Sequence, residues 1–237
     1  MTTDTSTRAV DRALSLLEVI CDGDGPTLAE SARLVDLAPS TALRLLRTLQ
    51  SSGFVRKDEA GQYRPGSRII QLGAQALSSD SLVGLARSAM DHLVMQTGES
   101  AYLSVQGHGD TALYLAIVEG THSVRHANWV GRTVPLHSSA AGQALTAPGA
   151  DVSAVGYVVV ERGVEADVTA IAVPVRAAER TVAALSLVIP SYRVVPADVT
   201  RFGELLVQAA ATVSRALGTH PETSAVAPVT REEERHD

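Results

Sequence analysis

The sequence predicts an α+β fold with two domains: an N-terminal winged helix-turn-helix, a linker helix, and a C-terminal domain of antiparallel strands and helices. Three observations lead to this prediction. Apolar residues recur at helical spacing over the N-terminal part of the chain. A short hairpin pattern follows the third predicted helix. Beyond Gly98 the pattern changes to short apolar runs separated by turn-forming residues, which is typical of antiparallel strands.

The length of 237 residues suits two domains of ordinary size. We expect the winged helix-turn-helix in residues 1–66, the linker helix in 67–80 and the second domain in 81–218. The remaining tail, residues 219–237, contains two prolines and the charged end REEERHD. We expect this tail to be disordered, because it has too few apolar residues to join a core.

The first two helices are predicted from an apolar face and from a capping box. The first runs from Arg8 to about Cys21, with apolar residues on one face. Cys21 is the chain's single cysteine and falls on this face, so we expect a small buried hydrophobic residue rather than a disulfide or a metal ligand. The second helix begins with Thr27 as N-cap and Glu30 three residues later, a capping box, and ends near Val35.

A third helix and a hairpin complete the first domain. After a three-residue connection, Pro39 and Ser40 open a helix that ends near residues 52–53. Two short helices joined by about three residues have the shape of a helix-turn-helix. Residues 54–64 then read as two short strands around a turn at 58–61, which predicts a wing directly after the third helix.

The outer face of the third helix and the hairpin carry the candidate DNA-contacting residues. They are polar or basic, whereas the inner side of the helix is apolar: Ser40, Thr41, Arg44, Arg47, Arg56 and Lys57. Arginine can donate two parallel hydrogen bonds to guanine, and hydroxyls near a helix N-terminus often bind phosphates. A solvated amphipathic helix would show the same pattern, but the preceding helix, the short turn and the hairpin favour double-stranded DNA as the partner.

The charge distribution supports this location. The whole chain has a formal net charge of -6, which argues against non-specific coating of nucleic acid. Residues 40–64, in contrast, contain five basic and two acidic residues. The aromatic content of 3% argues against RNA recognition by base stacking. Because one short recognition helix reads only a few base pairs, we expect a homo-oligomer on a palindromic operator.

The second domain should begin after the linker helix, which runs from Ser67 to about Leu77. A helix at 82–97 comes first, a helix at 139–145 interrupts the strands, and a helix at 197–217 ends the domain. The strand-like runs are Ala101–Gln106, Thr111–Val118, Val124–Asn128, Tyr157–Val160, Ala170–Arg176 and Thr181–Ile189.

The order of these motifs resembles the IclR-type transcriptional regulators over residues 8 to about 217. The N-terminal motifs are RALSLL at 12–17, PST followed by RLLRTL within 39–49, and GFVR leading to YRPG within 53–66. The second half contains GRTVPLHSSAAGQAL at 131–145. The resemblance implies a transcription regulator whose second domain resembles GAF and PAS sensors, with a curved antiparallel sheet, and binds a small-molecule effector.

By the same resemblance, the backbone amides near Ala140 and Ala141 are the candidates to bind an acidic effector at a helix start. An ordinary helix start capped by Ser138 or Ser139 is the alternative. The chain departs from the family in the short segment before Gly156 and in its pocket positions. Most of the polar groups expected there are replaced by aliphatic ones, and the aligned residues are Val160, Ala170, Ser186 and Val188.

The loss of these polar groups predicts an effector with an aromatic or aliphatic body and one carboxylate, since an unpaired buried polar group costs about 1–3 kcal/mol. The alternative is a ligand-independent DNA-binding regulator whose degenerate sensor domain serves only in oligomerisation. The sequence leaves open the effector, the operator, dimer or tetramer, and repression or activation.

Other classes of protein are disfavoured. No catalytic motif, cofactor motif or metal-ligand spacing is present, so we expect neither an enzyme nor a cofactor. We therefore expect His137 to be structural, and Trp129 to lie in the core or in a subunit contact. No apolar run is long enough to span a membrane, and the polar start lacks the features of a signal peptide. We expect a cytoplasmic protein.

Overall fold

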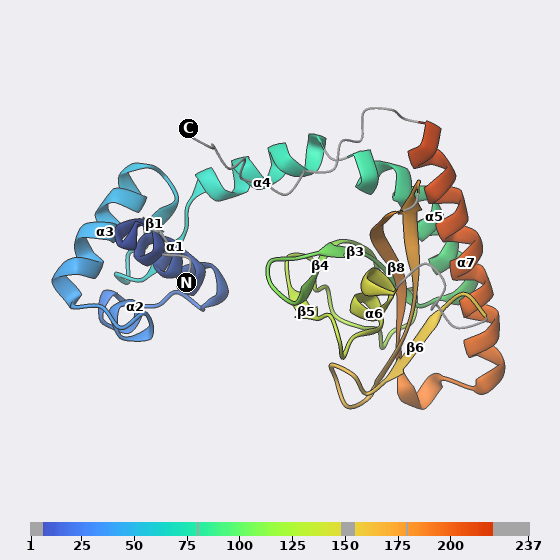
Figure 1. Cartoon of the computed structure of the whole chain (residues 1–237). Helices are drawn as coiled ribbons and strands as arrows, with labels where there is room; N and C mark the ends of the chain where they lie inside the picture. The colour runs from blue at the N-terminus through green and yellow to red at the C-terminus, as the bar shows by residue number, and fades with distance from the viewer. Residues whose placement is uncertain (1–6, 80, 148–154, 179, 220–237) are drawn as a thin grey trace, which may run out of the picture. The chain divides into compact units, whose positions relative to one another are not determined.

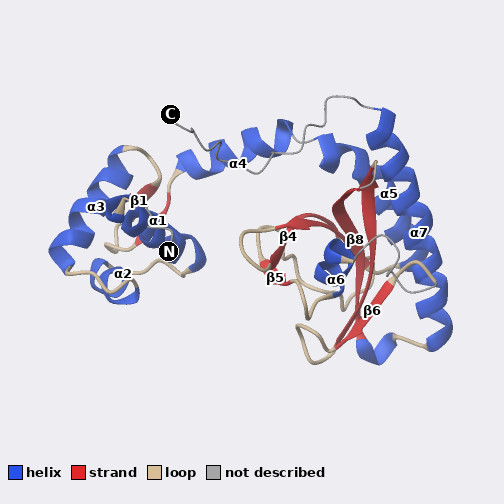
Figure 2. Cartoon of the chain, viewed as in Figure 1, coloured by secondary structure: helices blue, strands red, loops and turns tan. Residues whose placement is uncertain are grey.

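The computed structural model describes residues 7–79, 81–147, 155–178 and 180–219. The chain divides into two compact units, with the boundary after Ser79. The first unit is built mainly of helices, and the second is built around a sheet (Figure 2).

The first unit has the predicted order of three helices, a hairpin and a further helix (Figure 1). Thr27 caps the second helix in a complete capping box with Glu30, and Pro39 occupies the first turn of the third helix. The winged helix-turn-helix is thereby confirmed. Its elements are α1 (Arg8–Asp22), α2 (Leu28–Leu34), α3 (Pro39–Ser51), β1 (Val55–Lys57), β2 (Tyr63–Pro65) and α4 (Ser67–Ser79).

A small core holds α1, α2, α3 and the hairpin together. Each of these elements contributes to its buried side chains, which are Leu16, Ile20, Ala32, Ala42, Leu45, Leu46, Val55 and Tyr63. The end of the hairpin also lies close against the end of α3. The amide of Gly66 donates to the carbonyl of Phe54 at 2.8 Å, and a Cβ on Gly66 would lie 2.1 Å from the carbonyl oxygen of Gly53. A side chain does not fit at this contact, which fixes where the hairpin ends.

The predicted burial of Cys21 is wrong, because its side chain is exposed. The inward face of α1 is centred on Leu16 and Ile20, which are both fully buried. Cys21 lies about 100° further round the helix than Ile20, which takes it out of the core. Partial burial, and then the neighbouring charge of Asp22, raises the pKa of its thiol. This cysteine is therefore a surface thiol that stays protonated near neutral pH.

Within the described residues, the second unit is a six-stranded antiparallel sheet in the order β5-β4-β3-β8-β7-β6, with helices on both faces. Its strands are β3 (Ser100–Gln106), β4 (Thr111–Val118), β5 (Thr133–Pro135), β6 (Val158–Glu161), β7 (Val168–Ala177) and β8 (Arg180–Pro190). Its helices are α5 (Ser81–Thr97), α6 (Ala140–Thr146), the short 3-10 helix η1 (Ser191–Arg193) and α7 (Pro196–Thr219).

The sheet separates two packed layers, because successive side chains of a strand point to opposite faces. On one face Leu103 and Ile171 join the core formed with α5 and α7. Tyr102, which precedes Leu103, and Ala172, which follows Ile171, lie on the other face, where α6 packs. Figure 1 shows α6 on one side of the sheet and α5 and α7 on the other. Register shifts in β3 and β7 accompany the curvature of the sheet.

Residues 124–128, predicted as a strand, form no strand, and β5 was not predicted. Side-chain contacts determine the shape of this segment instead. The Tyr102 hydroxyl lies 2.6 Å from His126 Nδ1 and also contacts the carbonyl of Ala127. The remaining predicted helices and strands begin and end within two residues of the observed ones.

Two predictions fall outside the described residues. Only Thr219 of the predicted tail is described, so the expected disorder of the tail is not tested. The short segment before Gly156 also lies largely outside, at residues 148–154.

Candidate functional site

All of the predicted DNA-contacting residues lie at the surface of the first unit. On α3 the side chains of Ser40, Arg44 and Arg47 are exposed, and that of Thr41 is half-buried. The buried residues of α3 face the core from the opposite side. Among the described residues, no carboxylate forms an ion pair with Arg44, Arg47 or Arg56. These guanidinium groups are therefore free to meet phosphates or base edges.

The hairpin adds Arg56 and Lys57, both exposed on β1. The Lys57 ammonium lies 5.7 Å from the centre of the Tyr63 ring, a cation–π contact that does not neutralise its charge. Arg64 lies opposite Arg56 in the ladder, and its Nε is 3.3 Å from the Asp58 carboxylate. The hairpin thus presents two basic side chains and uses the third internally.

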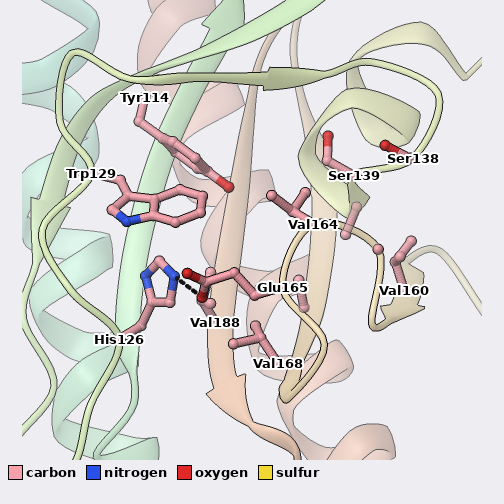
Figure 3. A pocket seen from close by; sticks show the side chains of 13 residues that line it. Tyr114, His126, Trp129, Ser138, Ser139, Val160, Val164, Glu165, Val168 and Val188 are labelled. Atoms are coloured by element: carbon pink, nitrogen blue, oxygen red, sulfur yellow. Dashed lines mark hydrogen bonds and ion pairs between the residues drawn. The ribbon is translucent and has the colours of Figure 1, made fainter. Parts of the chain in front are cut away.

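The second unit contains a cavity, partly open to solvent, on the face of the sheet that carries α6 (Figure 3). Its lining residues are Tyr114, His126, Trp129, Ser138, Ser139, Ala140, Val160, Gly163, Val164, Glu165, Val168, Ala170 and Val188. Four predicted effector residues therefore line it, namely Ala140, Val160, Ala170 and Val188. Ala141 and Ser186 do not, although both are buried.

Ser186 lies deeper than predicted. It pairs with Tyr102 of β3 and Ala172 of β7, on the face that α6 covers. Its hydroxyl and that of Ser104 are buried and have no hydrogen-bond partner among the described residues. The one polar pocket position expected from the sequence therefore lies outside the wall of the cavity.

The start of α6 is capped by a serine, as in one of the two alternatives considered from the sequence. Ser139 is the N-cap, because its Oγ accepts from the amide of Gly142 at 3.0 Å and donates to the carbonyl of Pro135 at 2.6 Å. The amides of Ala140 and Ala141 make no hydrogen bond to a described residue. The helix start is thus capped, and of its two unpaired amides only that of Ala140 belongs to a residue that lines the cavity.

Four further residues, which sequence reasoning did not assign to a site, form another wall of the cavity: Tyr114, His126, Trp129 and Glu165. The ring centres of His126 and Trp129 lie 4.7 Å apart, and those of Tyr114 and Trp129 lie 6.2 Å apart. Trp129 is half-buried in this wall. His126 Nε2 lies 3.1 Å from a carboxylate oxygen of Glu165, which joins the segment before β5 to the loop between β6 and β7 (Figure 3).

Burial governs the protonation of these groups. It lowers the pKa of His126, although the adjacent Glu165 carboxylate acts in the opposite direction. Burial, and then the charge of Glu165, raises the pKa of Tyr114 to about 12. Near neutral pH the imidazole is therefore neutral and the Tyr114 phenol keeps its proton. Glu165 is the one acidic side chain among the lining residues, which include no lysine or arginine.

His137 takes no part in this site. Its side chain is exposed, and its carbonyl accepts a hydrogen bond from the side-chain amide of Gln143 at 3.0 Å. In the described ranges, no three histidine, cysteine or acidic side chains come together as metal ligands. None of the described helices is both long enough and apolar enough to cross a membrane.

Two family profiles match the chain. The profile of the IclR helix-turn-helix domain matches residues 9–59. The profile of the C-terminal domain of the bacterial transcriptional regulator IclR matches residues 74–155 and 150–215. The second match alone covers more than half of the chain.

Curated relatives are transcription regulators. The chain is 36% identical to HTH-type transcriptional regulator BhcR of Paracoccus denitrificans over 141 residues, which are 59% of this chain and 50% of that protein. It is 33% identical to transcriptional repressor IclR of Escherichia coli over 143 residues, 59% of this chain and 52% of that protein. These two alignments span about half the length of the relatives. HTH-type transcriptional regulator XynR of E. coli is 28% identical and is covered over 97% of its length, with 89% of this chain.

Solved structures share the fold. An IclR transcriptional regulator from Alicyclobacillus acidocaldarius has a TM-score of 0.77 at 24% identity, covering 90% of this chain and 100% of that one. An IclR homologue from Microbacterium hydrocarbonoxydans, complexed with 4-hydroxybenzoate, has a TM-score of 0.74 at 23% identity, with the same coverage.

Proposed function

Because the chain belongs to the IclR family of bacterial DNA-binding transcription regulators, we propose that a small-molecule effector modulates its binding to an operator. One observation carries this proposal. A winged helix-turn-helix with unpaired arginines on the outer face of α3 and a sheet with a partly open cavity beside α6 occur in one chain. The family is one of regulators and not of enzymes, in agreement with the expectation from the sequence.

In this proposal α3 enters the major groove. Arg44 and Arg47 contact base edges, and the hydroxyls of Ser40 and Thr41 contact phosphates near the start of the helix. Arg56 and Lys57 of the hairpin contact the phosphate backbone at the flank. Two observations support this assignment. The side chains of Arg44, Arg47 and Arg56 are exposed, and none of the three forms an ion pair with a described residue.

The proposed effector is a carboxylate with an apolar body. The valines of the lining offer apolar contacts, and the unpaired amide of Ala140 offers a donor to one carboxylate oxygen. The related structure with bound 4-hydroxybenzoate, an aromatic acid, supports a ligand of this size and kind. Of the effector-binding residues proposed from the sequence, Ala140, Val160, Ala170 and Val188 line the cavity and are the ones we propose to contact the ligand. Ala141 and Ser186 do not line it.

We assign DNA binding to residues 1–66, a linker role to 67–80, and effector binding and oligomerisation to 81–218. A homo-oligomer would present two copies of α3 to the half-sites of a palindromic operator, about one helical turn apart. Small-angle scattering of the chain with and without operator DNA would measure the number of copies bound.

A ligand-independent regulator is the second candidate. The position of Ser186 below the cavity wall favours it, because the only polar residue retained from the expected pocket set does not reach a ligand. A thermal-shift screen over many metabolites separates the two candidates. A ligand that binds the native state raises the melting temperature by mass action, and a silent screen would support the ligand-independent regulator.

Genomic footprinting of the bound chain tests the DNA-binding half of the proposal. We expect protected sites with two related half-sites. The genes beside these sites would indicate the pathway of the effector. The absence of any protected sequence above background would contradict the proposal.

A further inference from the structure

We propose that Arg64 is a positioning residue for DNA binding: its guanidinium fixes the hairpin against the loop between α1 and α2, so that Arg56 and Lys57 meet the phosphate backbone. Arg64 itself does not contact DNA in this proposal. The inference rests on the proposed phosphate contacts of the hairpin and names the residue on which they depend. It is carried by the contacts that Arg64 makes within the first unit.

The hairpin is too small to hold its position alone. β1 and β2 have three residues each, and an isolated two-stranded hairpin is at best marginally stable in water. Tyr63 of β2 is buried in the core, and its amide donates to the carbonyl of Pro26 at 3.0 Å. The side chain of Arg64, the next residue, lies on the opposite face of the strand. Tyr63 thus attaches the inner face of the hairpin, and an attachment of the outer face has to come from other residues.

Arg64 attaches this outer face to the loop between α1 and α2. A Cβ on Gly25 would lie 2.5 Å from Nε and 2.7 Å from Nη1 of Arg64, so the guanidinium occupies the space that a side chain at position 25 would fill. Gly25 is buried, and its φ of +82° favours glycine. The guanidinium therefore packs on the backbone of the loop that leads into α2, the first helix of the helix-turn-helix.

Two side chains of the hairpin turn hold the guanidinium there. Nε of Arg64 donates to Asp58 Oδ2 at 3.3 Å, and Nη2 donates to Gln62 Oε1 at 2.9 Å. The other oxygen of Asp58 accepts from the backbone amide of Gln62 at 2.9 Å. This hydrogen bond, together with Arg64, lowers the pKa of Asp58, which is therefore ionised near neutral pH. One guanidinium thus joins the tip of the hairpin to the loop before α2.

The charges of the hairpin separate the roles of its two arginines. Arg56 lies directly opposite Arg64 in the ladder, where like charges repel each other. Asp58 compensates the charge of Arg64, and it leaves Arg56 without an ion pair to any described residue. A phosphate could bind Nε and Nη2 of Arg64 only by displacing Asp58 and Gln62. Arg56 is therefore the arginine of the hairpin that meets DNA, and Arg64 sets its position.

The first test compares two acidic residues of the turn. It measures fluorescence anisotropy of the full chain with a DNA duplex that carries a footprinted site. Asp58→Asn removes the charge that holds Arg64, so the affinity should fall about tenfold, as for the loss of a hydrogen bond to a charged group. If Arg64 contacted DNA directly, Asp58→Asn would free it and raise the affinity.

Glu59→Gln is the matched control for this change of charge. Glu59 is exposed in the same turn and forms no ion pair with a described residue. Its replacement should not lower the affinity, because it removes a charge that repels phosphates. An affinity of Asp58→Asn equal to or above that of Glu59→Gln would overturn the inference.

The second test is the salt dependence of DNA binding by Arg64→Lys. Lysine keeps the charge, but one ammonium does not reproduce the planar fork that reaches Asp58 and Gln62 together. The slope of log affinity against log salt concentration should become shallower by about 1 to 2, because the two phosphate contacts of the hairpin weaken. A variant that is only less stable would contain less active protein and keep the slope. An unchanged slope would contradict the positioning role.

A double-mutant cycle shows whether Arg64 acts through its neighbours. In a chain that carries Arg56→Gln and Lys57→Gln, the further change Arg64→Lys should leave the affinity for DNA the same, because the contacts that it positions are already lost. Equal losses from Arg64→Lys in both backgrounds would show that Arg64 acts independently of these contacts, and the inference would be wrong.

The failure of this inference can be told from the failure of the proposed function. If the unmodified chain protects no site, DNA binding itself is wrong. If it protects sites and the chain with Arg56→Gln and Lys57→Gln binds them equally well, the assigned phosphate contacts are wrong, and the inference fails with them. If these two residues are needed but Arg64→Lys behaves as the unmodified chain does, only the positioning role is wrong.

Discussion

At the scale of single residues, Arg44 tests the proposed contact with DNA. It is exposed on α3 and has no ion pair with a described residue. Replacing it with alanine should weaken operator binding by about 1–3 kcal/mol and relax the preference for one base. Fluorescence anisotropy with a footprinted site measures this loss. Arg87→Ala on α5 is the matched control, since Arg87 is exposed and pairs with Asp91 in the other unit. Equal affinity of Arg44→Ala and the unmodified chain would show that Arg44 does not contact the operator.

His126 gives a prediction for pH. Burial lowers its pKa in the folded chain, so the unfolded chain takes up a proton more readily. The free energy of unfolding should therefore fall as the pH drops through the ordinary histidine range, from about 7 to about 5. Urea denaturation at a series of pH values measures this. His126→Gln should weaken the dependence, whereas His92→Gln, at an exposed position of α5, should not. The same slope in all three chains would contradict the prediction.

The candidate site was predictable only in part. Ala140, Val160, Ala170 and Val188 follow from the order of motifs along the chain, and all four line the cavity. Glu165 could not be found in this way, because its place in the cavity wall depends on the fold, and the histidine that it contacts lies 39 positions away. Nothing in a local pattern distinguishes this glutamate from an ordinary loop residue.

At the scale of elements, Gly66 tests how the hairpin is attached to α3. A Cβ there would lie 2.1 Å from the carbonyl oxygen of Gly53, and backbone cannot move aside as a flexible side chain can. Gly66→Ala should destabilise the first unit by about 1–3 kcal/mol. Gly73→Ala on α4 is the control: no atom lies within 4 Å of the added carbon, so a gain of roughly 0.5–1 kcal/mol is expected.

Hydrogen exchange measured by mass spectrometry locates these effects. In Gly66→Ala, peptides from α3 and β1 should exchange faster, and peptides from α5 should not change. In Gly73→Ala, α4 should exchange more slowly. Unchanged protection of α3 in Gly66→Ala would mean that the contact with Gly53 relaxes at no cost.

The helices and most strands were predictable because the spacing of their apolar residues repeats over a short stretch of sequence. Alternation and helical spacing are both visible within a few residues, and caps such as Thr27 mark their ends. Residues 124–128 were wrongly predicted as a strand because of their apolar residues. The contacts of His126 with Tyr102 and Glu165 determine the path of this segment instead. The burial of Cys21 was wrongly predicted for a related reason. The spacing of apolar residues along a helix does not show how far round the helix the core extends.

At the scale of the whole molecule, the proposed coupling between effector and operator must be reciprocal. If the effector changes operator affinity by some factor, saturating operator must change effector affinity by the same factor, typically about 5- to 150-fold. Calorimetric titration of the effector with and without operator DNA measures this. A DNA of unrelated sequence is the control. Equal effector affinity in every case would show that the two sites are not coupled and that the ligand does not regulate DNA binding.

The ends of the six-stranded sheet bear on how the protein behaves at high concentration. The two terminal strands, β5 and β6, are short, and β5 ends on Pro135, which has no amide hydrogen to donate. Exposed strand edges are templates for aggregation, and short edges with proline or charge oppose it. Glu161 places a charge at the end of β6. The two sheet edges thus oppose pairing between the sheets of different molecules. We therefore expect the protein to resist aggregation at the high concentrations that ligand titrations require.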